Sequence, residues 1–284
     1  MSTPHIAGIN LHPIKSTAIR PVNSAYVAPA GLAGDREWVI IDATGEKVSA
    51  RELARLFHIV AETPETGGTD EDLLLTAAGM TPLAVGRPTQ GSCDVTLFGR
   101  APLPGRPAGS EADAWIRTAT DRDDLRLVWC ANPAARQLDP SHSRPGDPAA
   151  YQHASPVPDL ATASVGRNND WVSQTATEAG EAPPAQITAQ RYRPNLLIDG
   201  VLEAFAEDTW ARIRIGDVVL RRATRVDRCV VTTIDPRDLS HGREPIRTLA
   251  RHRRAAGKTW AAVHYIPDVP GRIAVGDALT VQIG

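Results

Sequence analysis

The sequence predicts a mainly β protein with a few helices, of the α+β class, on three observations. Most apolar segments are short, rich in β-branched residues and bounded by Gly or Pro, as strands are. In the second half, strand-like segments follow one another at the close spacing that is typical of a β-barrel. Between the halves, the Pro- and Gly-rich stretch 100–110 has the composition of a linker. We therefore expect a β module over residues 1–120 and a barrel domain over residues 121–284.

The N-terminal part contains two strand candidates and one short helix candidate. The segments WVIID (38–42) and DVTLF (94–98) predict strands, because β-branched and aromatic residues dominate them. Ser49 is followed three residues later by Glu52, a spacing that resembles a capping box. This pair predicts a short helix over ARELARLF (50–57).

The second half predicts more strands and a small number of helices. SEADAWIRTAT (110–120) is a plausible helix, and EPIRTLARHRR (244–254) predicts a basic helix. RIRIGDVVLRRATRV (212–226) has the pattern of a strand, a turn and a second strand. The closing GRIAVGDALTVQI (271–283) again places turn residues before alternating β-branched positions, and EAGEAPPA (178–185) predicts a solvated loop.

Composition and charge argue against several classes of function. The 284 residues are 42% hydrophobic, which is enough for a substantial core. Lys plus Arg number 31 against 33 Asp plus Glu, so a net charge of −2 gives no reason to expect nucleic acid or an anionic membrane as a partner. No stretch approaches the ~20 apolar residues that cross a bilayer, and the opening MSTPHIAGIN does not resemble a targeting segment. We therefore expect a cytoplasmic protein.

The cysteines have to be judged one by one. Cys93, Cys130 and Cys229 lie far apart without a C-x-x-C pair, which argues against a disulfide framework, a structural zinc site or an iron–sulfur cluster. Cys229 follows Arg228 and precedes a run of β-branched residues. A neighbouring cation lowers the pKa of a thiol, and a strand would fix the direction of the sulfur, as a ligand of a soft or high-valent metal requires. The alternative is a buried structural thiol, because free cysteine is among the most buried residue types.

The segment RYRPN (191–195) carries groups that suit an acceptor-rich ligand. Pro194 is expected to hold Arg193 in an extended conformation, which would preorganise the guanidinium. Such a group binds a phosphate or a polar ring well, and Asn195 can donate and accept beside it. An ordinary Pro turn with solvated arginines is the alternative.

The segment HPIKST (12–17) places Lys15 and Ser16 where a strand should become a loop, and GDREW (34–38) places Arg36 at the entry to a strand. These residues could hold a phosphate, although they could equally be solvated charges. The glycines of a P-loop are missing, as are H-E-x-x-H, G-x-S-x-G and G-x-G-x-x-G. The sequence therefore gives no support for a nucleoside triphosphate, hydrolase or dinucleotide site.

Seven short motifs occur in the order found in MOSC-domain proteins. They are HPIKS (12–16), GDREW (34–38), HASP (153–156), RYRPN (191–195), AEDTW (206–210), RCVVTTIDP (228–236) and PGRIAVGD (270–277). From about residue 5 onward, the chain resembles the MOSC-domain molybdenum-cofactor enzymes related to the mitochondrial amidoxime-reducing component and its bacterial counterparts. The resemblance implies an N-terminal β module packed on a MOSC-type β-barrel with a few helices.

The resemblance also implies roles for particular residues. Cys229 would be the thiolate on molybdenum and the catalytic residue, with Arg228 close to the metal. The phosphate of the molybdopterin would be held by Lys15, Ser16 and Arg36, and its pterin would be contacted by Ser155, Arg193 and Asn195. An arginine beside a thiolate fits a ligand that must stay deprotonated in an anionic cofactor.

Three residues depart from the pattern of these enzymes. His153 stands where an aspartate is common, Asp227 where a serine often precedes the arginine and cysteine, and His264 near a tyrosine position. The details of the pterin contacts and of the substrate pocket are therefore open. His153 or His264 could donate a proton, since imidazole titrates near neutral pH, but a lone histidine also serves as a packing or solvent-facing residue.

The resemblance implies a molybdenum-cofactor-dependent reductase that removes oxygen from N-hydroxylated or N-oxide compounds at molybdenum. Because the chain has no cysteine cluster for an iron–sulfur cluster of its own, electrons would come from a separate ferredoxin, flavoprotein or cytochrome. We expect a monomer with a small N-hydroxylated substrate, and neither nucleic acid nor membrane as a partner. The alternatives are a non-catalytic carrier of molybdenum cofactor or sulfur, and a MOSC-like barrel without cofactor that acts as an interaction module.

Overall fold

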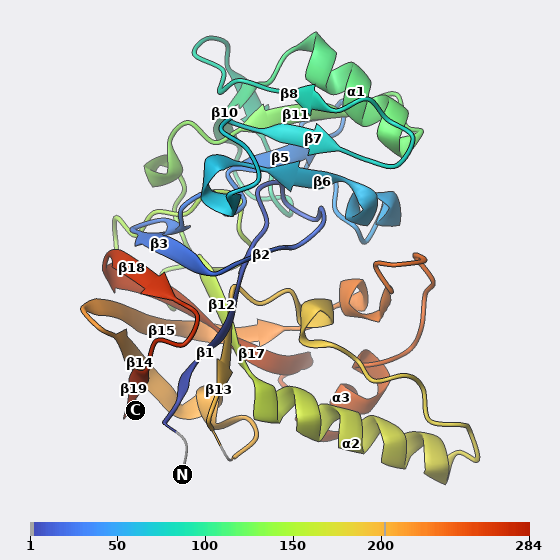
Figure 1. Cartoon of the computed structure of the whole chain (residues 1–284), viewed down its shortest axis with the longest axis vertical. Coiled ribbons are helices and arrows are strands. Elements are labelled where there is room, and N and C mark those ends of the chain that lie inside the picture. The colour runs from blue at the N-terminus through green and yellow to red at the C-terminus, as the bar shows by residue number, and fades with distance from the viewer. Residues whose placement is uncertain (1–2, 202) are drawn as a thin grey trace. The chain divides into compact units, whose positions relative to one another are not determined.

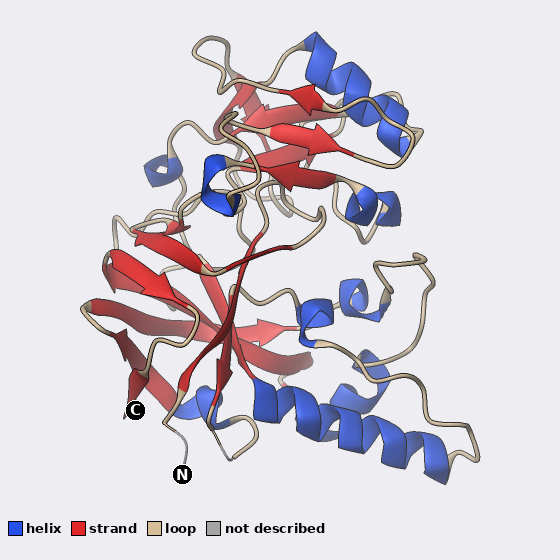
Figure 2. Cartoon of the chain, in the orientation of Figure 1, coloured by secondary structure: helices blue, strands red, loops and turns tan. Residues whose placement is uncertain are grey.

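The computed structural model describes residues 3–201 and 203–284, which divide into two compact units. The C-terminal unit consists of the described residues up to Asn10, Asn23–Ala28 and Ala154–Gly284, and the N-terminal unit of Leu11–Val22 and Pro29–His153. Strands dominate the regular structure (Figure 1, Figure 2), so the predicted mainly β fold with a few helices is confirmed. The boundary at residue 120 stays a prediction, because the two units share the N-terminal segment of the chain.

The C-terminal unit is built on a bent sheet. Its main strands are β1 (His5–Leu11), β12 (Val157–Ala161), β13 (Leu196–Asp199), β14 (Trp210–Ile215), β15 (Val218–Asp227), β17 (Lys258–Val269) and β19 (Leu279–Ile283). They lie in the order β19-β14-β15-β17-β12-β13-β1. The long antiparallel pair β15 and β17 contains register shifts. Bulges of this kind increase twist and bend a sheet, as a partly closed barrel requires.

Two α-helices pack on this sheet. α2 (Thr162–Glu178) connects the parallel pair β12 and β13, and α3 (Ile246–Arg253) precedes the short strand β16 (Arg254–Ala255). Their shared apolar cluster with the sheet comprises Leu160, Val172, Ile187, Tyr192, Val226, Leu249, Ala261 and Ala262. The remaining elements of the unit are β3 (Ser24–Ala28), which pairs with β18 (Gly271–Ala274), and the 3-10 helices η4 (Ala189–Tyr192), η5 (Ala206–Thr209) and η6 (Val230–Thr233).

The N-terminal unit contains two smaller sheets and one α-helix. One sheet has the order β5 (Trp38–Ile41), β11 (Arg126–Trp129), β10 (Leu103–Pro107), β9 (Cys93–Val95), and the other joins β6 (Val60–Glu62), β7 (Leu74–Thr76) and β8 (Leu83–Ala84). α1 (Ser110–Thr120) packs through Ile116 into a core that includes Trp38, Leu56 and Leu127. The unit also contains β2 (Arg20–Val22), β4 (Gly31–Leu32), η1 (Ala54–His58), η2 (Pro64–Thr66) and η3 (Pro133–Ala135).

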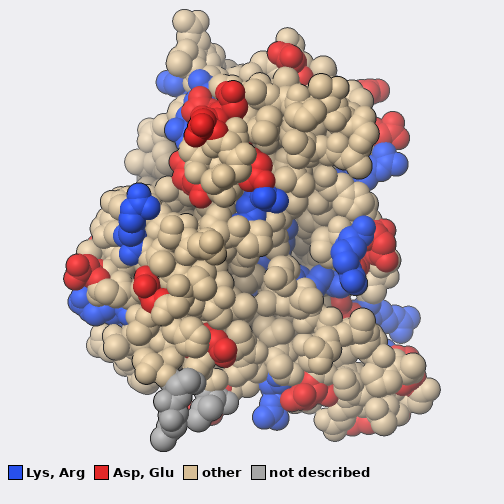
Figure 3. Space-filling view, viewed as in Figure 1, with Lys and Arg blue, Asp and Glu red and all other residues tan. Residues whose placement is uncertain are grey.

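The surface and the helices are ordinary for a globular chain. Lys and Arg are interspersed with Asp and Glu on the face that Figure 3 draws, in keeping with the small net charge. Within the part of the chain that the structure describes, no helix is both long and apolar enough to cross a membrane. Electrostatic binding, where it occurs, must therefore depend on local clusters of charge.

Most predicted elements are confirmed, and one helix is different in kind. α1, α3, the β14–β15 hairpin, β18 and β19 all lie where the sequence predicts them. One arm of the predicted capping box forms, because the Ser49 amide donates to the Glu52 carboxylate at 2.7 Å, but the Ser49 hydroxyl donates to the same carboxylate and the Glu52 amide donates to the Ser49 carbonyl. An α-helix over 50–57 is nevertheless wrong, since these residues form turns followed by the 3-10 helix η1.

Candidate functional site

Cys229 lies at the junction of a strand and a 3-10 helix. β15 ends at Asp227, and Cys229, in extended backbone, is the residue before η6. The prediction that a strand runs through the cysteine is therefore wrong. The β-branched residues after it turn instead, because Thr232 donates from its amide and its hydroxyl to the Cys229 carbonyl at 3.1 and 3.0 Å. The residue is partly exposed, so its thiol is not sealed in the apolar core.

Arg228 is fixed by the protein on one side only. Its Nε donates to the Ala261 carbonyl at 2.7 Å, and its Nη1 donates to the Tyr192 carbonyl at 2.7 Å. Its Nη2 is buried and has no hydrogen-bond partner among the described residues. Burial lowers the pKa of Arg228 to about 10, which leaves the guanidinium charged at neutral pH. A charged donor group beside Cys229 is thus oriented and still able to bind an anion.

Arg193 is the next residue after Tyr192, whose carbonyl accepts a hydrogen bond from Arg228. It ends η4 in the left-handed region, at φ 52° and ψ 47°. The prediction of an extended Arg193 is therefore wrong. A following proline disfavours the right-handed helical region for the preceding residue, and the chain leaves η4 through the left-handed region instead. The loop that carries Arg193 and the segment that carries Cys229 are thus held together through Tyr192 and Arg228.

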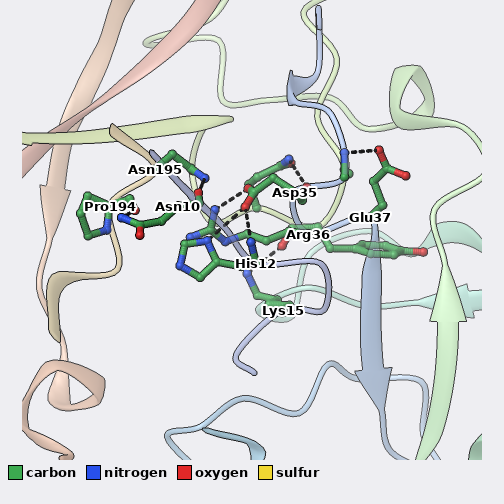
Figure 4. Close-up of polar contacts among 12 residues, drawn as sticks. Asn10, His12, Lys15, Asp35, Arg36, Glu37, Pro194 and Asn195 are labelled. Carbon is green, nitrogen blue, oxygen red and sulfur yellow. Dashed lines mark hydrogen bonds and ion pairs between the residues drawn. The ribbon is translucent and has the colours of Figure 1, made fainter. Parts of the chain in front are cut away.

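Asn195 and Ser155 have different surroundings. The Asn195 side-chain amide donates to the Asn10 carbonyl at 2.7 Å, and the Asn10 amide nitrogen donates to the Asn195 carbonyl at 2.8 Å (Figure 4). Asn195 therefore has a clear structural role in joining the start of β13 to β1. Ser155 is fully buried, and its hydroxyl has no hydrogen-bond partner among the described residues. A buried hydroxyl in this state costs about 1 to 3 kcal/mol, which a polar ligand would recover.

In the N-terminal unit, Lys15 and Arg36 are buried cations. Arg36 donates to Asp35 at 2.5 Å, while His12 donates its backbone amide to the other Asp35 oxygen at 2.9 Å (Figure 4). Lys15 donates to the Tyr151 carbonyl at 2.7 Å and is 7% exposed. Ser16 follows in a turn at φ 72°. The predicted phosphate residues Lys15, Ser16 and Arg36 therefore lie on two segments of this unit, 12–17 and 34–38, which a hydrogen bond between His12 and Asp35 joins.

One further cation, Arg136, lies near His153, and no sequence motif predicted it. The buried Arg136 donates to the carbonyls of Ala150 and Gln152 at 2.6 and 2.8 Å, and also to the His153 carbonyl. Desolvation of the ring by the surrounding protein, followed by the charges of Lys15 and Arg136, lowers the pKa of His153 to about 3. Since His153 keeps an exposed surface, water screens part of this effect. The direction still disfavours the imidazolium, so His153 is poorly suited to donate a proton at neutral pH.

The other two departures from the family pattern have structural settings. Asp227 is exposed and accepts a hydrogen bond from the Thr259 amide at 3.1 Å. His264 is 3% exposed in β17, opposite Pro158 of β12. Its burial separates it from bulk water, so the predicted role of His264 as a proton donor stays a prediction.

Three of the predicted site residues have a left-handed backbone conformation. Nine described non-glycine residues have positive φ, and Ser16, Arg36 and Arg193 are three of them. The left-handed conformation costs an ordinary residue roughly 1 to 2 kcal/mol. Such costs cluster at ligand and active sites, where the surrounding structure enforces them.

The donor set fits a cofactor with one soft ligand and an anionic, acceptor-rich body. Groups of three or more His, Cys, Asp or Glu that could hold a metal ion do not occur among residues 3–201 and 203–284. A metal held by one protein thiolate, with its remaining ligands from a cofactor, needs no such cluster. In the C-terminal unit, the spare donors of Arg228 and Ser155 suit an anionic, acceptor-rich ligand chemically. The N-terminal unit by itself contains the buried cations Lys15, Arg36 and Arg136. A MOSC-type molybdenum-cofactor protein is the class that this fold and these residues define.

Comparison with known proteins agrees with this class. The MOSC domain family matches residues 160–280, and the MOSC N-terminal beta barrel domain family matches residues 3–123. The chain is 30% identical over 295 residues to mitochondrial amidoxime-reducing component 1 of Mus musculus, covering 96% of this chain and 80% of that protein. The Homo sapiens protein of the same name is 29% identical over 292 residues, covering 96% and 81%. The chain therefore belongs to the MOSC-domain family that contains the mitochondrial amidoxime-reducing components.

A solved structure gives a weaker match. The YUAD protein of Bacillus subtilis is 10% identical, with a TM-score of 0.42 over 100% of this chain and 97% of that one. This likeness is too distant to add to the assignment, which depends on the sequence families and the site residues.

Proposed function

We propose that the protein is a molybdenum-cofactor-dependent reductase of N-hydroxylated or N-oxide compounds. Membership of the family supports the broader class, a reductase that binds the molybdenum cofactor. The observation that carries the proposal is a partly exposed thiol, Cys229, beside Arg228, whose buried Nη2 has no described partner. A purely structural thiol would not require a charged, half-satisfied donor next to it.

The residues of this chain would bind, orient and charge-balance the cofactor. Cys229 would be the metal ligand and the catalytic residue, and Arg228 would balance negative charge of the bound cofactor. Lys15, Ser16 and Arg36 would bind the phosphate, while Ser155, Arg193 and Asn195 would contact the pterin. When bound, the cofactor would supply the two-electron chemistry. For an amidoxime, two electrons and two protons break the N–O bond and give an amidine and water.

Electrons would come from a separate protein. Cys93, Cys130 and Cys229 lie far apart in the sequence without a C-x-x-C pair, so the sequence has no motif for an iron–sulfur cluster. The donor would be a ferredoxin, a flavoprotein or a cytochrome. A cytoplasmic location and a monomeric state remain expectations from the sequence, which cell fractionation and analytical ultracentrifugation would test.

The decisive experiment compares metal and pterin contents. Protein from a cofactor-competent host is expected to contain molybdenum and to release an oxidised, fluorescent pterin on denaturation. Cys229→Ala should lose most of the molybdenum, whereas Cys93→Ala, a second partly exposed thiol, should keep it. Equal molybdenum in the Cys229 variant and the wild type would contradict the proposal.

The second candidate is a non-catalytic carrier of the cofactor or of sulfur. The partly exposed position of Cys229 favours it, because a carrier must release what it binds. A carrier would contain molybdenum and pterin but would not reduce an aromatic amidoxime when reduced viologen supplies the electrons. Viologen-driven formation of the amidine would exclude the carrier and support the reductase.

A further inference from the structure

A half-buried tryptophan, Trp260, lies close along the backbone to the proposed metal ligand. The Arg228 amide donates to the Thr259 carbonyl at 2.8 Å, and Asp227 is opposite Trp260 in the ladder between β15 and β17 (Figure 1). Cys229 follows Arg228 in the sequence and Trp260 follows Thr259, so each is the next residue after one partner of this hydrogen bond. A short covalent path with one hydrogen bond connects the side chain at the surface to the thiol.

The turn that precedes Trp260 is exposed. β16 pairs with the start of β17, and the turn between them has Ala256 at φ 51° and Gly257 at φ 75°. The Trp260 indole donates to the Ala255 carbonyl at 3.1 Å, which fixes the ring against the turn. All residues of the segment 254–258 are exposed. The turn therefore presents a surface that another protein could reach.

Cations surround this tryptophan. Arg225 lies 4.9 Å and Lys258 lies 5.4 Å from the ring centre of Trp260. Arg253 donates to the Trp260 carbonyl at 3.3 Å, and the exposed Arg254 precedes the turn. We call this set, Arg225, Arg253, Arg254, Lys258 and Trp260, the Trp260 patch.

Acidic residues near the patch are fewer than its cations. Asp208 accepts from Arg253 and lies 3.8 Å from Arg225, and Asp227 accepts from the Thr259 amide. Four cations against two carboxylates leave the patch positive, although the chain as a whole has a net charge of −2. A local excess of positive charge attracts an acidic surface and raises the rate of encounter.

We infer that the Trp260 patch is the docking surface for a small acidic electron-transfer protein. The inference rests on the proposed function, which needs two electrons per substrate from another protein. An aromatic side chain with charged residues at its edge is the usual composition of a protein interface centre and rim. Two one-electron deliveries by a ferredoxin would supply the electrons, and solvent protons would complete the formation of water from the substrate oxygen.

The test uses binding as its main measurement. Wild-type protein from a cofactor-competent host and a plant-type [2Fe–2S] ferredoxin are compared by surface plasmon resonance at low and high salt. The double variant Arg254→Glu/Lys258→Glu should bind at least ~10-fold more weakly, because both changes place like charges together. The matched control Arg214→Glu/Arg272→Glu carries the same change of charge on the exposed faces of β14 and β18 and should bind as the wild type does.

Three outcomes would overturn the inference. They are no binding of ferredoxin by the wild type, an equal loss of binding in the control, and unchanged binding in the double variant. Trp260→Phe should keep most of the binding, whereas Trp260→Ala should lose it, with thermal unfolding measured for both to exclude a folding defect.

Viologen-driven reduction separates this inference from the proposed function. The double variant should reduce an aromatic amidoxime with viologen as fast as the wild type, while its ferredoxin-driven rate falls. If the wild type shows no viologen-driven reduction, the proposed function fails. If viologen works but the double variant has a normal ferredoxin-driven rate and affinity, only the docking surface is wrong.

Discussion

Replacing Asp159 should make the C-terminal unit more stable. Asp159 lies on the central strand β12 and is fully buried, and neither of its carboxyl oxygens has a hydrogen-bond partner among the described residues. Burial, followed by the nearby carboxyl of Glu207, raises the pKa of Asp159 well above its ordinary value. Glu207 is also buried, but it accepts from the Ala161 amide at 3.3 Å and the Ser164 hydroxyl at 2.9 Å. Burial of Asp159 therefore costs more folding free energy than burial of Glu207.

The size of the effect follows from burial and proton linkage. A buried polar group without a partner costs about 1 to 3 kcal/mol, so Asp159→Val should raise the free energy of unfolding by about that amount at mildly acidic pH. The folded chain holds the Asp159 proton more tightly than the unfolded chain does. Wild-type stability should therefore fall as pH rises between the unfolded and the folded pKa, by up to about 1.4 kcal/mol per pH unit.

Urea unfolding followed by tryptophan fluorescence from about pH 5 to about pH 9 measures both effects. Asp159→Asn keeps the size and polarity of the side chain but cannot ionise, so it should lose the Asp159 part of the pH dependence while gaining little stability at low pH. The reasoning is refuted if Asp159→Asn keeps the pH dependence of the wild type. It is also refuted if Asp159→Val is less stable than the wild type throughout the range.

Three further changes test the N-terminal unit. Lys15→Met should reduce the pterin released on denaturation by about 10-fold, because it removes a buried charged donor, and pterin retained as in the wild type would contradict the phosphate role. His153 should stay neutral down to mildly acidic pH, since its pKa is lowered, and an NMR titration of its ring near the ordinary value would contradict this. Gly105→Ala should cost about 1 to 3 kcal/mol in urea unfolding, because a Cβ would clash with Val128 and Val95; unchanged stability would contradict the close packing of β10.

The pattern of apolar residues predicted the regular elements well. β14 and β19 alternate more and less buried positions over part of their length, and α1 buries one face, so periodicity and turn residues were sufficient for these elements. The capping-box spacing at Ser49 predicted one of its two hydrogen bonds but not the helix type. Local hydrogen bonds of this kind form in turns as well as in α-helices, so they do not decide which one follows.

The motifs singled out candidate site residues, but the local structure around two of them differs from the expectation. Arg193 is left-handed and not extended, and the strand expected at Cys229 ends at Asp227, although Cys229 itself has extended backbone. The reasons are local: Thr232 and Thr233 donate hydroxyl hydrogen bonds three residues back, and η4 ends in the left-handed region before Pro194. No sequence motif marked Arg136 or Asp159, because their roles depend on burial by residues that are distant in the sequence.

The strained backbone links the fold to the proposed site. Ser16, Arg36 and Arg193 are three of the eight residues that the family resemblance assigns to the cofactor, and they are also three of the nine described non-glycine residues with positive φ. If stability alone governed these positions, glycine would occupy them at a gain of roughly 1 kcal/mol each. Each keeps a polar side chain instead. Polar side chains retained at three strained positions agree with the ligand-binding role that we propose for these residues.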